Sequence, residues 1–445
     1  MNLFSLLGKR AEANNPIKIG LIGAGKFGSM FLSQARKTPG FHIVGIADLD
    51  RDKVKASLAD VGWQPEQFGA QSFDQAERNG STFITDDSQA LIKAEGIEVI
   101  IEATGNPAAG IHHALMAFDH GCHVIAVNVE ADVLAGPLLA ARARQAGVVY
   151  SLAYGDQPAL IAEMVDWARA CGLEVICAGK GTKYLPEYHG STPDTVWDYY
   201  GLSPERAALA AMNPQMFNSF LDGTKSSIEM AAVANACALS TPDDGLLFPA
   251  IGTHELPESL KPASDGGVLA AKGTVEVISS IHRDGSDVVN DLRWGVYCVF
   301  EAGSAYVERC FADYGLVTDR TGRYSAMYKP FHLIGLELGI SVASAAIRNE
   351  PTGVAGGWHG DVVAVAKKDL MPGDMLDGEG GFCVWGKLFP AKKSYAMKGL
   401  PIGLAHHVKM IRPVKQGAAL TWGDVAVDEG TQAVLFRREM EATFS

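Results

Sequence analysis

The sequence lacks both an excess of basic residues and a pattern of paired cysteines. Its 38 lysines and arginines are outnumbered by 51 aspartates and glutamates, which gives a net charge of -13. Proteins that bind nucleic acid cluster positive charge against the phosphate backbone, so this balance argues against a nucleic-acid partner. The 7 cysteines are scattered without a CxxC pair. This arrangement is typical of reduced thiols in a cytoplasmic protein, and not of a disulfide framework or a zinc site.

Long hydrophobic runs are also missing. No apolar stretch reaches the roughly 18 residues that a membrane span needs, so we expect no membrane partner. Residues 1–15 carry a short apolar patch before Lys9 and Arg10, which is not the order of a signal peptide. We therefore expect an N-terminal arm here, either a short helix or a frayed segment. A chain of 445 residues is long enough for two or three domains.

Short apolar strands alternate with helices in the first part of the chain. This pattern is typical of a parallel sheet that is covered on both faces. We predict an α/β fold with a doubly wound parallel sheet of the Rossmann type in a domain spanning 16–180. Its strands are expected at 17–23, 42–48, 98–105, 123–128, 147–155 and 173–179, with helices such as 158–172 between them.

The alternation ends near Lys180. We predict an α+β catalytic and dimerisation domain over 181–352, and hence a homodimer or a larger homo-oligomer. Short strands and turns dominate the last part, 353–445, which we expect to be a β-rich module. Within 181–352 the sequence predicts strands at 271–283, 293–302 and 305–311 and a long apolar helix at 332–350.

The stretch GAGKFG, residues 23–28, has the G-x-G-x-x-G spacing between a predicted strand and a predicted helix. Gly23 permits a tight turn, Gly25 lets a pyrophosphate approach the backbone, and Gly28 allows close helix packing. Lys26 and Phe27 begin the helix whose free N–H groups would hold the pyrophosphate. The motif therefore predicts a dinucleotide site.

An acid, Asp48, ends the next predicted strand, 20 residues after Gly28. An acid at this place favours the 2′-hydroxyl of NAD and repels the 2′-phosphate of NADP. Arg51 and Lys53 follow, however, and either could neutralise a phosphate. The residues leave NAD and NADP both open. Thr104 and Gly105, in EATGNP, follow a later strand and are expected to border the nicotinamide.

A helix is predicted from about residue 221, in the stretch LDGTKSSIEMAAVANACAL. Its later turns are apolar, yet it opens with Asp222, Lys225, Ser226 and Glu229. At 3.6 residues per turn these four would lie on one face of a helix. A charged face that borders a core favours a cleft, although a solvated i,i+4 ion pair between Lys225 and Glu229 is the alternative.

The order of the glycine loop, EATGNP, VIAVN and a further domain after YGDQP resembles the homoserine dehydrogenase family over roughly residues 16–350. The segment from VVAVAKKDLMPGDML to KQGAALTWGDV resembles a SAF domain, a β-clip module. Together they are most similar to the homoserine dehydrogenase-like reductoisomerases. These convert 1-deoxy-D-xylulose 5-phosphate to 2-C-methyl-D-erythritol 4-phosphate with NADPH, for isoprenoid synthesis.

The resemblance implies several roles. Asn128 would contact the cofactor, but Val129 replaces the lysine that true homoserine dehydrogenases carry. Lys225 would act as an electrophile or proton donor, and Asp222 or Glu229 as a base or a metal ligand. A divalent cation such as Mg or Mn is implied by ordinary reductoisomerases, without a ligand set.

Two groups of basic residues are candidates for contact with a phosphorylated substrate. Lys180 and Lys183 follow a parallel strand, where open α/β sheets bind ligands. Arg320, Arg323, Lys329 and His332 lie close in sequence and would suit a phosphate. In both cases solvated loop residues are the competing explanation. The alternative functions are a homoserine or sugar-acid dehydrogenase on the same scaffold, and a nucleotide-sensing protein without turnover.

Overall fold

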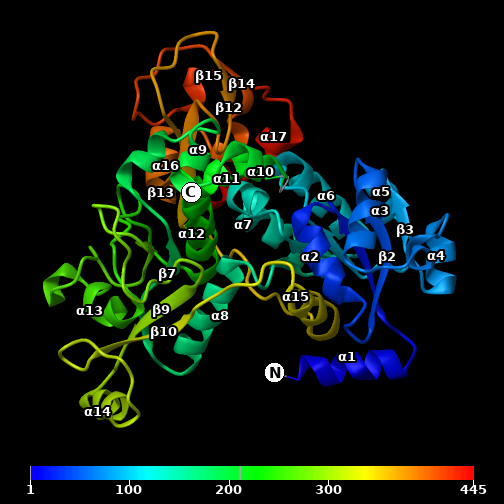
Figure 1. Cartoon of the computed structure of the whole chain (residues 1–445), viewed down its shortest axis with the longest axis horizontal. Coiled ribbons are helices and arrows are strands. Elements are labelled where there is room, and N and C mark those ends of the chain that lie inside the picture. Colours follow the sequence, from blue (N-terminus) through cyan, green and yellow to red (C-terminus); the bar gives the residue numbers. More distant parts are fainter. Residues whose placement is uncertain (1, 210–211) are drawn as a thin grey trace. The chain divides into compact units, whose positions relative to one another are not determined.

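The chain divides into two compact units. The computed structural model describes residues 2–209 and 212–445. The first unit comprises Met1–Leu160 and Leu333–Ala355, and the second comprises Ile161–His332 and Gly356–Ser445. The predicted domain boundary at residue 180 falls inside a strand of the second unit, β7 (Glu174–Thr182). The chain therefore leaves the first unit and returns to it once (Figure 1).

A parallel sheet of six strands forms the centre of the first unit (Figure 1). In spatial order the strands are β3 (Phe83–Thr85), β2 (Phe41–Ala47), β1 (Ile17–Ile22), β4 (Val99–Glu102), β5 (His123–Ala126) and β6 (Tyr150–Leu152). The order 3-2-1-4-5-6 is that of the doubly wound Rossmann fold. The predicted fold class is confirmed.

Helices connect these strands. They are α1 (Leu3–Glu12), α2 (Lys26–Ala35), α3 (Arg51–Asp60), η1 (Pro65–Phe68), α4 (Phe73–Asn79), α5 (Ser88–Ile92), α6 (Pro107–Asp119) and α7 (Val129–Ala146), and α8 (Gln157–Ala170) begins in this unit. The long helix predicted at 332–350 starts later than predicted. It begins at Gly339 as α15 (Gly339–Ala343), followed by the π-helical η5 (Ser344–Arg348). Gly335 has φ +77°, which a right-handed helix does not allow.

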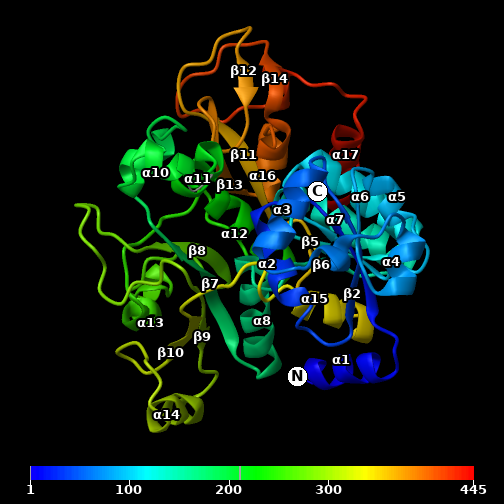
Figure 2. The same ribbon diagram turned by 45° about the vertical axis from the view of Figure 1, so that its right-hand side comes forward.

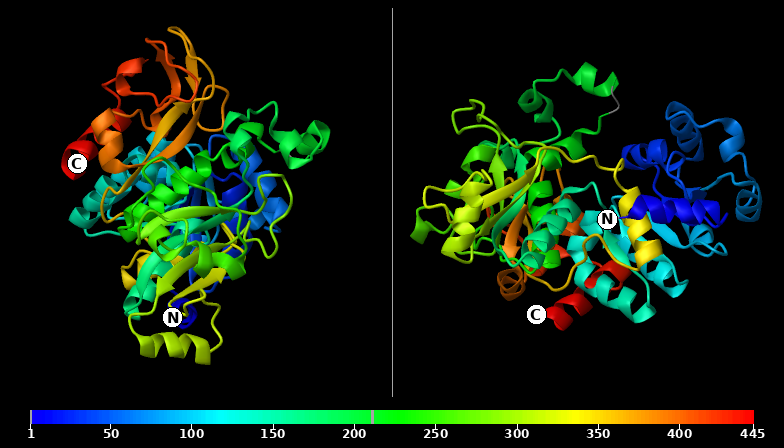
Figure 3. Two further views of the ribbon diagram at one scale, coloured as in Figure 1. Left: turned by 90° about the vertical axis from the view of Figure 1, so that its left-hand side faces the viewer. Right: turned by 90° about the horizontal axis from the view of Figure 1, so that it is seen from below.

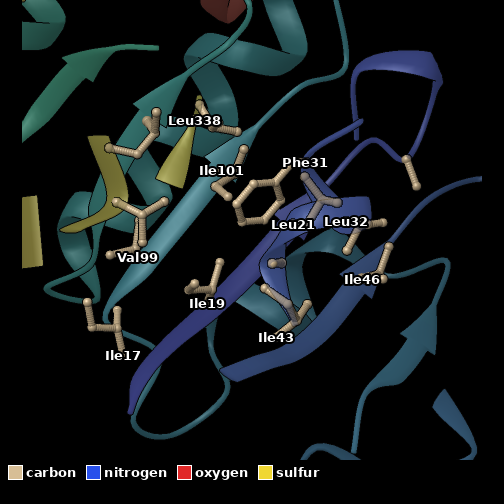
Figure 4. Packing of buried hydrophobic residues seen from close by; sticks show 14 of the residues in the cluster. Ile17, Ile19, Leu21, Phe31, Leu32, Ile43, Ile46, Val99, Ile101 and Leu338 are labelled. Carbon is tan, nitrogen blue, oxygen red and sulfur yellow. The ribbon is translucent and has the colours of Figure 1, made fainter. Parts of the chain in front are cut away.

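The returning segment completes the core of the first unit. Figure 4 shows Ile19 and Leu21 of β1 and Phe31 and Leu32 of α2 in one apolar cluster, with Leu338 beside Val99 and Ile101 of β4. Leu338 is completely buried. Full burial of such a side chain contributes about 1.5–3 kcal/mol, so residues 333–355 stabilise the unit that they rejoin.

The second unit contains a four-stranded mixed sheet with the order β10-β9-β7-β8. Its other strands are β8 (Thr274–Ser279), β9 (Val296–Glu301) and β10 (Tyr324–Lys329). β7 is parallel to β8 and antiparallel to β9. The sequence pattern placed residues 173–179 in the parallel sheet of the first unit, and this was wrong, because β7 pairs with β8 and β9 instead.

The segment predicted as a strand at 305–311 is a helix, α14 (Ala305–Asp313). Ser304 accepts a hydrogen bond from the backbone N–H of Val307 at its N-terminus, as N-cap residues do. The other helices of this unit outside the tail are η2 (Pro186–Gly190), α9 (Val196–Tyr200), α10 (Pro204–Leu209), α11 (Pro214–Leu221), α12 (Thr224–Cys237), η3 (Thr253–Glu255), α13 (Leu256–Ser259) and η4 (Ala263–Asp265).

The buried helix α12 lies at the centre of the second unit. It packs against β7 and β8 on one side and against β11 (Gly360–Ala366) and β13 (Val384–Pro390) on another (Figure 2). Nearly all of its residues are buried. The tail is β-rich, as predicted from the turns, and its strands β11 and β13 are covered by this helix.

The tail ends in a helix rather than a strand. Its remaining elements are β12 (Met375–Asp377), α16 (Ala391–Met397), η6 (Ile402–Leu404), β14 (His406–Met410), η7 (Trp422–Asp424), β15 (Val425–Ala426) and α17 (Gln432–Phe444). The guanidinium of Arg437 in α17 donates to both carboxylate oxygens of Asp361 in β11, at 3.0 and 2.6 Å. This buried fork holds α17 against the tail sheet (Figure 3). Among the helices of residues 2–209 and 212–445, none has the length and apolar character of a membrane span.

Candidate functional site

The glycine loop of the first unit has three glycines with three different surroundings. Gly23 has φ +90°, and a Cβ there would meet the carbonyl oxygen of Ala103 at 2.6 Å. A Cβ on Gly28 would lie 2.8 Å from the carbonyl oxygen of Gly23, so α2 packs closely on the loop. A Cβ on Gly25, by contrast, would have no protein atom within 4 Å. The backbone is therefore open at Gly25, where a pyrophosphate would approach the N-terminus of α2.

Asp48, at the end of β2, is bound to the glycine loop. Its Oδ2 accepts the backbone N–H of Ala24 at 2.7 Å, and its Oδ1 accepts that of Asp50 at 3.0 Å. Asp50 in turn caps α3 by accepting the N–H of Lys53 at 2.9 Å. Arg51, the first residue of α3, is exposed beside it. Oδ2 of Asp48 thus joins the strand end to the glycine loop, Oδ1 fixes the turn before α3, and Arg51 and Lys53 are both exposed cations near a phosphate site.

Thr104 belongs to a hydrogen-bonded chain behind the loop that follows β4. Its Oγ1 donates to Oε1 of the buried Glu102 at 2.6 Å, and that oxygen lies 3.2 Å from Nδ1 of His113. Nε2 of His113 lies 3.0 Å from Oγ of Ser88. The amide of Asn128 donates to Thr104 Oγ1 at 3.3 Å and to the carbonyl of Asn106 at 2.8 Å. Asn128 and Glu102 therefore hold the loop 104–106, which includes Gly105, in one conformation.

The acid Asp222 does not lie on the helix that the sequence predicted. It ends α11, and Gly223, with φ +90°, separates it from the first residue of α12. Its carboxylate is completely buried and lies 2.7 Å from Nζ of Lys367, which follows β11. Burial raises the pKa of Asp222, and Lys367 opposes that rise. The one-face arrangement of Asp222 with Lys225 and Glu229 was therefore wrong.

Glu229 and Lys180 form a second buried ion pair. Lys180 projects from β7 toward α12 and donates to Oε2 of Glu229, and both residues are at most 5% exposed. Removing one partner of a buried pair of this kind would leave the other without its counter-charge. Two of the predicted site residues are thus brought together, by a strand and a helix of the same unit. Lys225, the second residue of α12, is half-buried next to this helix end.

Lys183 follows the end of β7 and donates to the backbone carbonyl of Tyr199 at 2.7 Å. Burial and then the nearby Arg293 lower the pKa of Lys183, while Asp287 acts in the opposite direction. Arg293 was not among the residues that the sequence singled out. It lies in the turn Leu292–Gly295, before β9, which is closed by a hydrogen bond of 2.9 Å.

The predicted phosphate cluster is not one cluster. Arg323 precedes β10 and is bound to Glu301 at 2.5 Å and to Asp265 at 3.1 Å. Arg320 is largely exposed, 3.8 Å from Glu258. Lys329 ends β10, and His332 lies beyond it with its Nδ1 2.7 Å from the carbonyl of Trp294. Six residues of extended strand span about 20 Å, so one phosphate cannot contact both ends.

No metal centre can be assigned to residues. Within the described ranges, no group of three or more His, Cys, Asp and Glu side chains is placed to hold an ion. His406 and His407 begin β14, and neither belongs to such a group.

Sequence reasoning missed Glu102, Lys367 and Arg293. Glu102 stands in EATGNP, directly before residues that were predicted to border the nicotinamide, so its place was a usable signal. The sequence around Lys367 contained no such signal, because its partner Asp222 is 145 residues away in the chain. Pairings at such separation depend on the tertiary fold.

The six-stranded sheet and its open glycine loop define the class, a Rossmann fold with a loop suited to a dinucleotide, and the comparisons add similarity to NAD(P)-dependent oxidoreductases. Two family models agree. Residues 17–127 match the model described as "Oxidoreductase family, NAD-binding Rossmann fold", and residues 155–338 match "Oxidoreductase DRL, catalytic domain". The second match covers β7, α12 and the Lys180–Glu229 pair. The search of curated proteins gives no match.

Solved structures give weak similarities. An oxidoreductase domain protein from Kribbella flavida is 17% identical over 38% of this chain and 44% of that one, with a TM-score of 0.28. A homoserine dehydrogenase from Thiobacillus denitrificans is 17% identical over 50% and 49%, with a TM-score of 0.36. A probable dehydrogenase from Thermotoga maritima is 12% identical over 76% and 91%, with a TM-score of 0.38. The chain thus spans less than half the length of the first two.

Proposed function

We propose that this protein reduces the carbonyl group of a phosphorylated ketose with NADPH, and that the reaction is the reductive isomerisation of 1-deoxy-D-xylulose 5-phosphate. The observation that carries the proposal is the buried Lys180–Glu229 pair in the segment that matches an oxidoreductase catalytic domain. A buried ammonium group can stabilise negative charge that develops on a reacting oxygen.

The residues of α7 argue for a substrate other than homoserine. Val129 is the first residue of this helix and is 1% exposed. It stands where the resemblance to homoserine dehydrogenases implies a lysine, and a buried valine supplies neither a proton nor a charge. Asn128 is present but is used to hold the loop 104–106.

Arg51 supports the choice of NADPH. A 2′-phosphate needs a cation, and Arg51 is exposed at the start of α3. Asp48, which would repel the phosphate, has both carboxylate oxygens bound to backbone N–H groups of its own loop. NAD is the alternative that a comparison of the two cofactors would reveal.

The proposed reaction has two balanced steps. The carbon skeleton first rearranges beside the ketone, without net oxidation or reduction, and yields an aldehyde. The aldehyde carbon then receives a hydride from the reduced nicotinamide, which leaves oxidised, and its oxygen receives a proton. In this proposal Lys180 polarises the reacting oxygen, Glu229 holds that lysine in place, and Lys225 supplies the proton.

Turnover of the candidate substrates tests the proposal. The purified protein with NADPH and 1-deoxy-D-xylulose 5-phosphate should oxidise the cofactor, followed at 340 nm, and produce 2-C-methyl-D-erythritol 4-phosphate, identified by NMR. Homoserine with NADP or NAD should give no turnover. Turnover of homoserine or a sugar acid alone would establish the simpler dehydrogenase. Tight nucleotide binding without turnover of any candidate would favour the sensing protein.

Lys225→Ala separates chemistry from cofactor binding. The variant should lose at least about 100-fold in kcat, because proton donation contributes 10²–10⁴-fold, while its Kd for NADPH, measured by fluorescence titration, stays unchanged. Lys93→Ala, which removes a lysine from the C-terminal end of α5, is the control. A kcat within a few-fold of the parent protein would remove Lys225 from the chemistry.

A further inference from the structure

We propose that Lys183 and Arg293 form a binding site for the phosphate group of the substrate, in place of the scattered residues between 320 and 332. The inference rests on the proposed function for its substrate, and on the placement of two cations for the site itself.

Backbone packing brings the two residues together. The turn Leu292–Gly295 lies directly against β7, since a Cβ on Gly181 would be 1.9 Å from the carbonyl oxygen of Leu292 and 3.0 Å from the backbone nitrogen of Arg293. Gly181 also donates its N–H to the carbonyl of Gly295 at 3.0 Å. Lys183 follows two residues later, so both cations lie at the carboxyl end of β7.

Both side chains extend toward α9. Lys183 donates to the carbonyl of Tyr199 in this helix. Burial raises the pKa of Tyr200, the last residue of α9, to about 12, and the nearby Arg293 opposes that rise. The carboxylate of Asp222, which precedes α12, adds to the rise in the pKa of the same tyrosine. Lys183 and Arg293 therefore both lie near α9.

Neither cation has an acidic partner. Among the described residues, no carboxylate lies within 4.0 Å of the Lys183 ammonium or the Arg293 guanidinium, in contrast to Lys180, Lys367 and Arg323. Asp287 is close enough to affect Lys183 but is exposed, and Asp291 accepts the backbone N–H of Arg293 at 2.8 Å. Two like charges repel each other, and an anion that lies between them makes their proximity favourable.

The chemistry of the pair fits a phosphate. A guanidinium offers a planar fork of donors and an ammonium offers a point charge, and phosphate sites use both. The guanidinium of Arg293 lies over the ring of Trp294, 4.9 Å from its centroid, which limits its orientations. Both side chains are half-exposed and can be reached by a ligand.

The position of Lys183 also suits a sugar phosphate. Lys183 lies beyond the carboxyl end of β7, three residues after Lys180. A ketose phosphate carries its phosphate at the end of the carbon chain away from the carbonyl. The subsite would hold that end while Lys180 and Glu229 act on the other.

Substitution of each cation tests the site. The variants are Arg293→Gln and Lys183→Gln, and Arg309→Gln is the matched control, since its guanidinium lies over the ring of Tyr306 at 5.7 Å in the same unit. Inorganic phosphate is titrated into each NADPH-bound protein and followed by the ³¹P linewidth. The parent and Arg309→Gln should show saturable binding, and the other two should lose at least about tenfold in affinity. Equal binding in all four, or none in the parent, would overturn the site.

Kinetics separate this inference from the proposed function. With 1-deoxy-D-xylulose 5-phosphate, Arg293→Gln should raise KM at least about tenfold and leave the Kd for NADPH unchanged. Arg293→Lys keeps the positive charge but not the planar guanidinium donors, so its KM should lie between those of the parent and Arg293→Gln. It also replaces Arg293→Gln as the test if that variant fails to fold. If phosphate binding is lost as expected but the substrate is never turned over, the site stands and the reaction is another. If turnover occurs with an unchanged KM in Arg293→Gln and Lys183→Gln, the reaction stands and the site is wrong.

Discussion

The three glycines of the glycine loop differ in whether the folded protein itself needs a residue without a side chain at that position. Gly23 and Gly28 face neighbouring carbonyl oxygens at 2.6 and 2.8 Å from their added Cβ positions, whereas Gly25 faces open space. The first two glycines are therefore required by the protein itself. Gly25 has no such constraint from the protein, which leaves its backbone open to a ligand at the N-terminus of α2.

Gly25→Ala should separate these roles. Its φ of -64° and ψ of -164° suit alanine, so the thermal midpoint should stay within about 2 °C of the parent. The Kd for NADPH should rise about tenfold or more, because the methyl group occupies the approach of the pyrophosphate. Fluorescence titration and thermal unfolding measure the two effects. Gly28→Ala is the comparison, and it should lose stability as well as affinity. Unchanged NADPH affinity in Gly25→Ala would contradict the placement of the pyrophosphate.

At the scale of elements, the ion pairs of α12 explain why this apolar helix has charged residues near its start. Each acid near its start forms an ion pair with a lysine from another part of the unit. Glu229 pairs with Lys180 on β7, and Asp222 pairs with Lys367, which follows β11. The ion pairs thus join the helix entrance to the mixed sheet on one side and to the tail on the other. Asp222 thus has a buried counter-charge, Lys367, at 2.7 Å.

Removal of Lys367 should therefore destabilise the second unit. Its ammonium donates to the carbonyls of Ser191 at 2.7 Å and Gly381 at 2.8 Å besides pairing with Asp222. Lys367→Met leaves a buried carboxylate without its cation, which costs about 3–5 kcal/mol. The double variant Asp222→Asn with Lys367→Met should recover part of that loss. Urea unfolding followed by tryptophan fluorescence measures both, and a loss under 1 kcal/mol in Lys367→Met would show that Asp222 does not depend on Lys367.

The sequence predicted elements best where local patterns and tertiary contacts agree. β1, α2 and β4 were found because their apolar runs and the glycine loop specify the same fold. α14 was taken for a strand because AYVERCF can be read with either period, and the cap at Ser304 was the signal that favoured a helix. β7 looked like another parallel strand, since its partners β8 and β9 lie about 100 residues further along the chain.

The candidate site, too, could be predicted where it depends on local sequence patterns but not where it depends on tertiary contacts. Lys180 and Glu229 could be singled out from their local surroundings, but their contact could not, because it needs β7 and α12 to pack together. Arg320 and Arg323 are close in sequence to Lys329 and His332, but the extended strand β10 lies between the two pairs.

At the scale of the whole molecule, buried acids make stability depend on pH. Asp132 in α7 is completely buried, and burial raises its pKa to about 7, against a smaller opposing effect of the Tyr150 hydroxyl. In the unfolded chain the pKa is near 4. The folded state therefore binds the proton more tightly, and the unfolding free energy contributed by this group falls as pH rises from about 4 to about 7.

Asp132→Asn should remove that dependence. The gain in unfolding free energy of the variant over the parent should be near zero at about pH 4 and should grow to about 4 kcal/mol above pH 7, since three pKa units correspond to that energy. Urea unfolding of both proteins across this range isolates the effect, because all other titrating groups are shared. A difference that stays constant with pH would mean that Asp132 is ionised in the folded protein.

The return of residues 333–355 to the first unit has a consequence for how the protein is made. During synthesis the nucleotide-binding sheet emerges long before Leu338, which fills part of its core. The ribosome must add all of Ile161–His332 before that side chain exists. A nascent chain stopped at residue 160 would therefore lack the apolar side chains of 333–355 that complete this core, so the first unit can finish its packing only after most of the polypeptide has been translated.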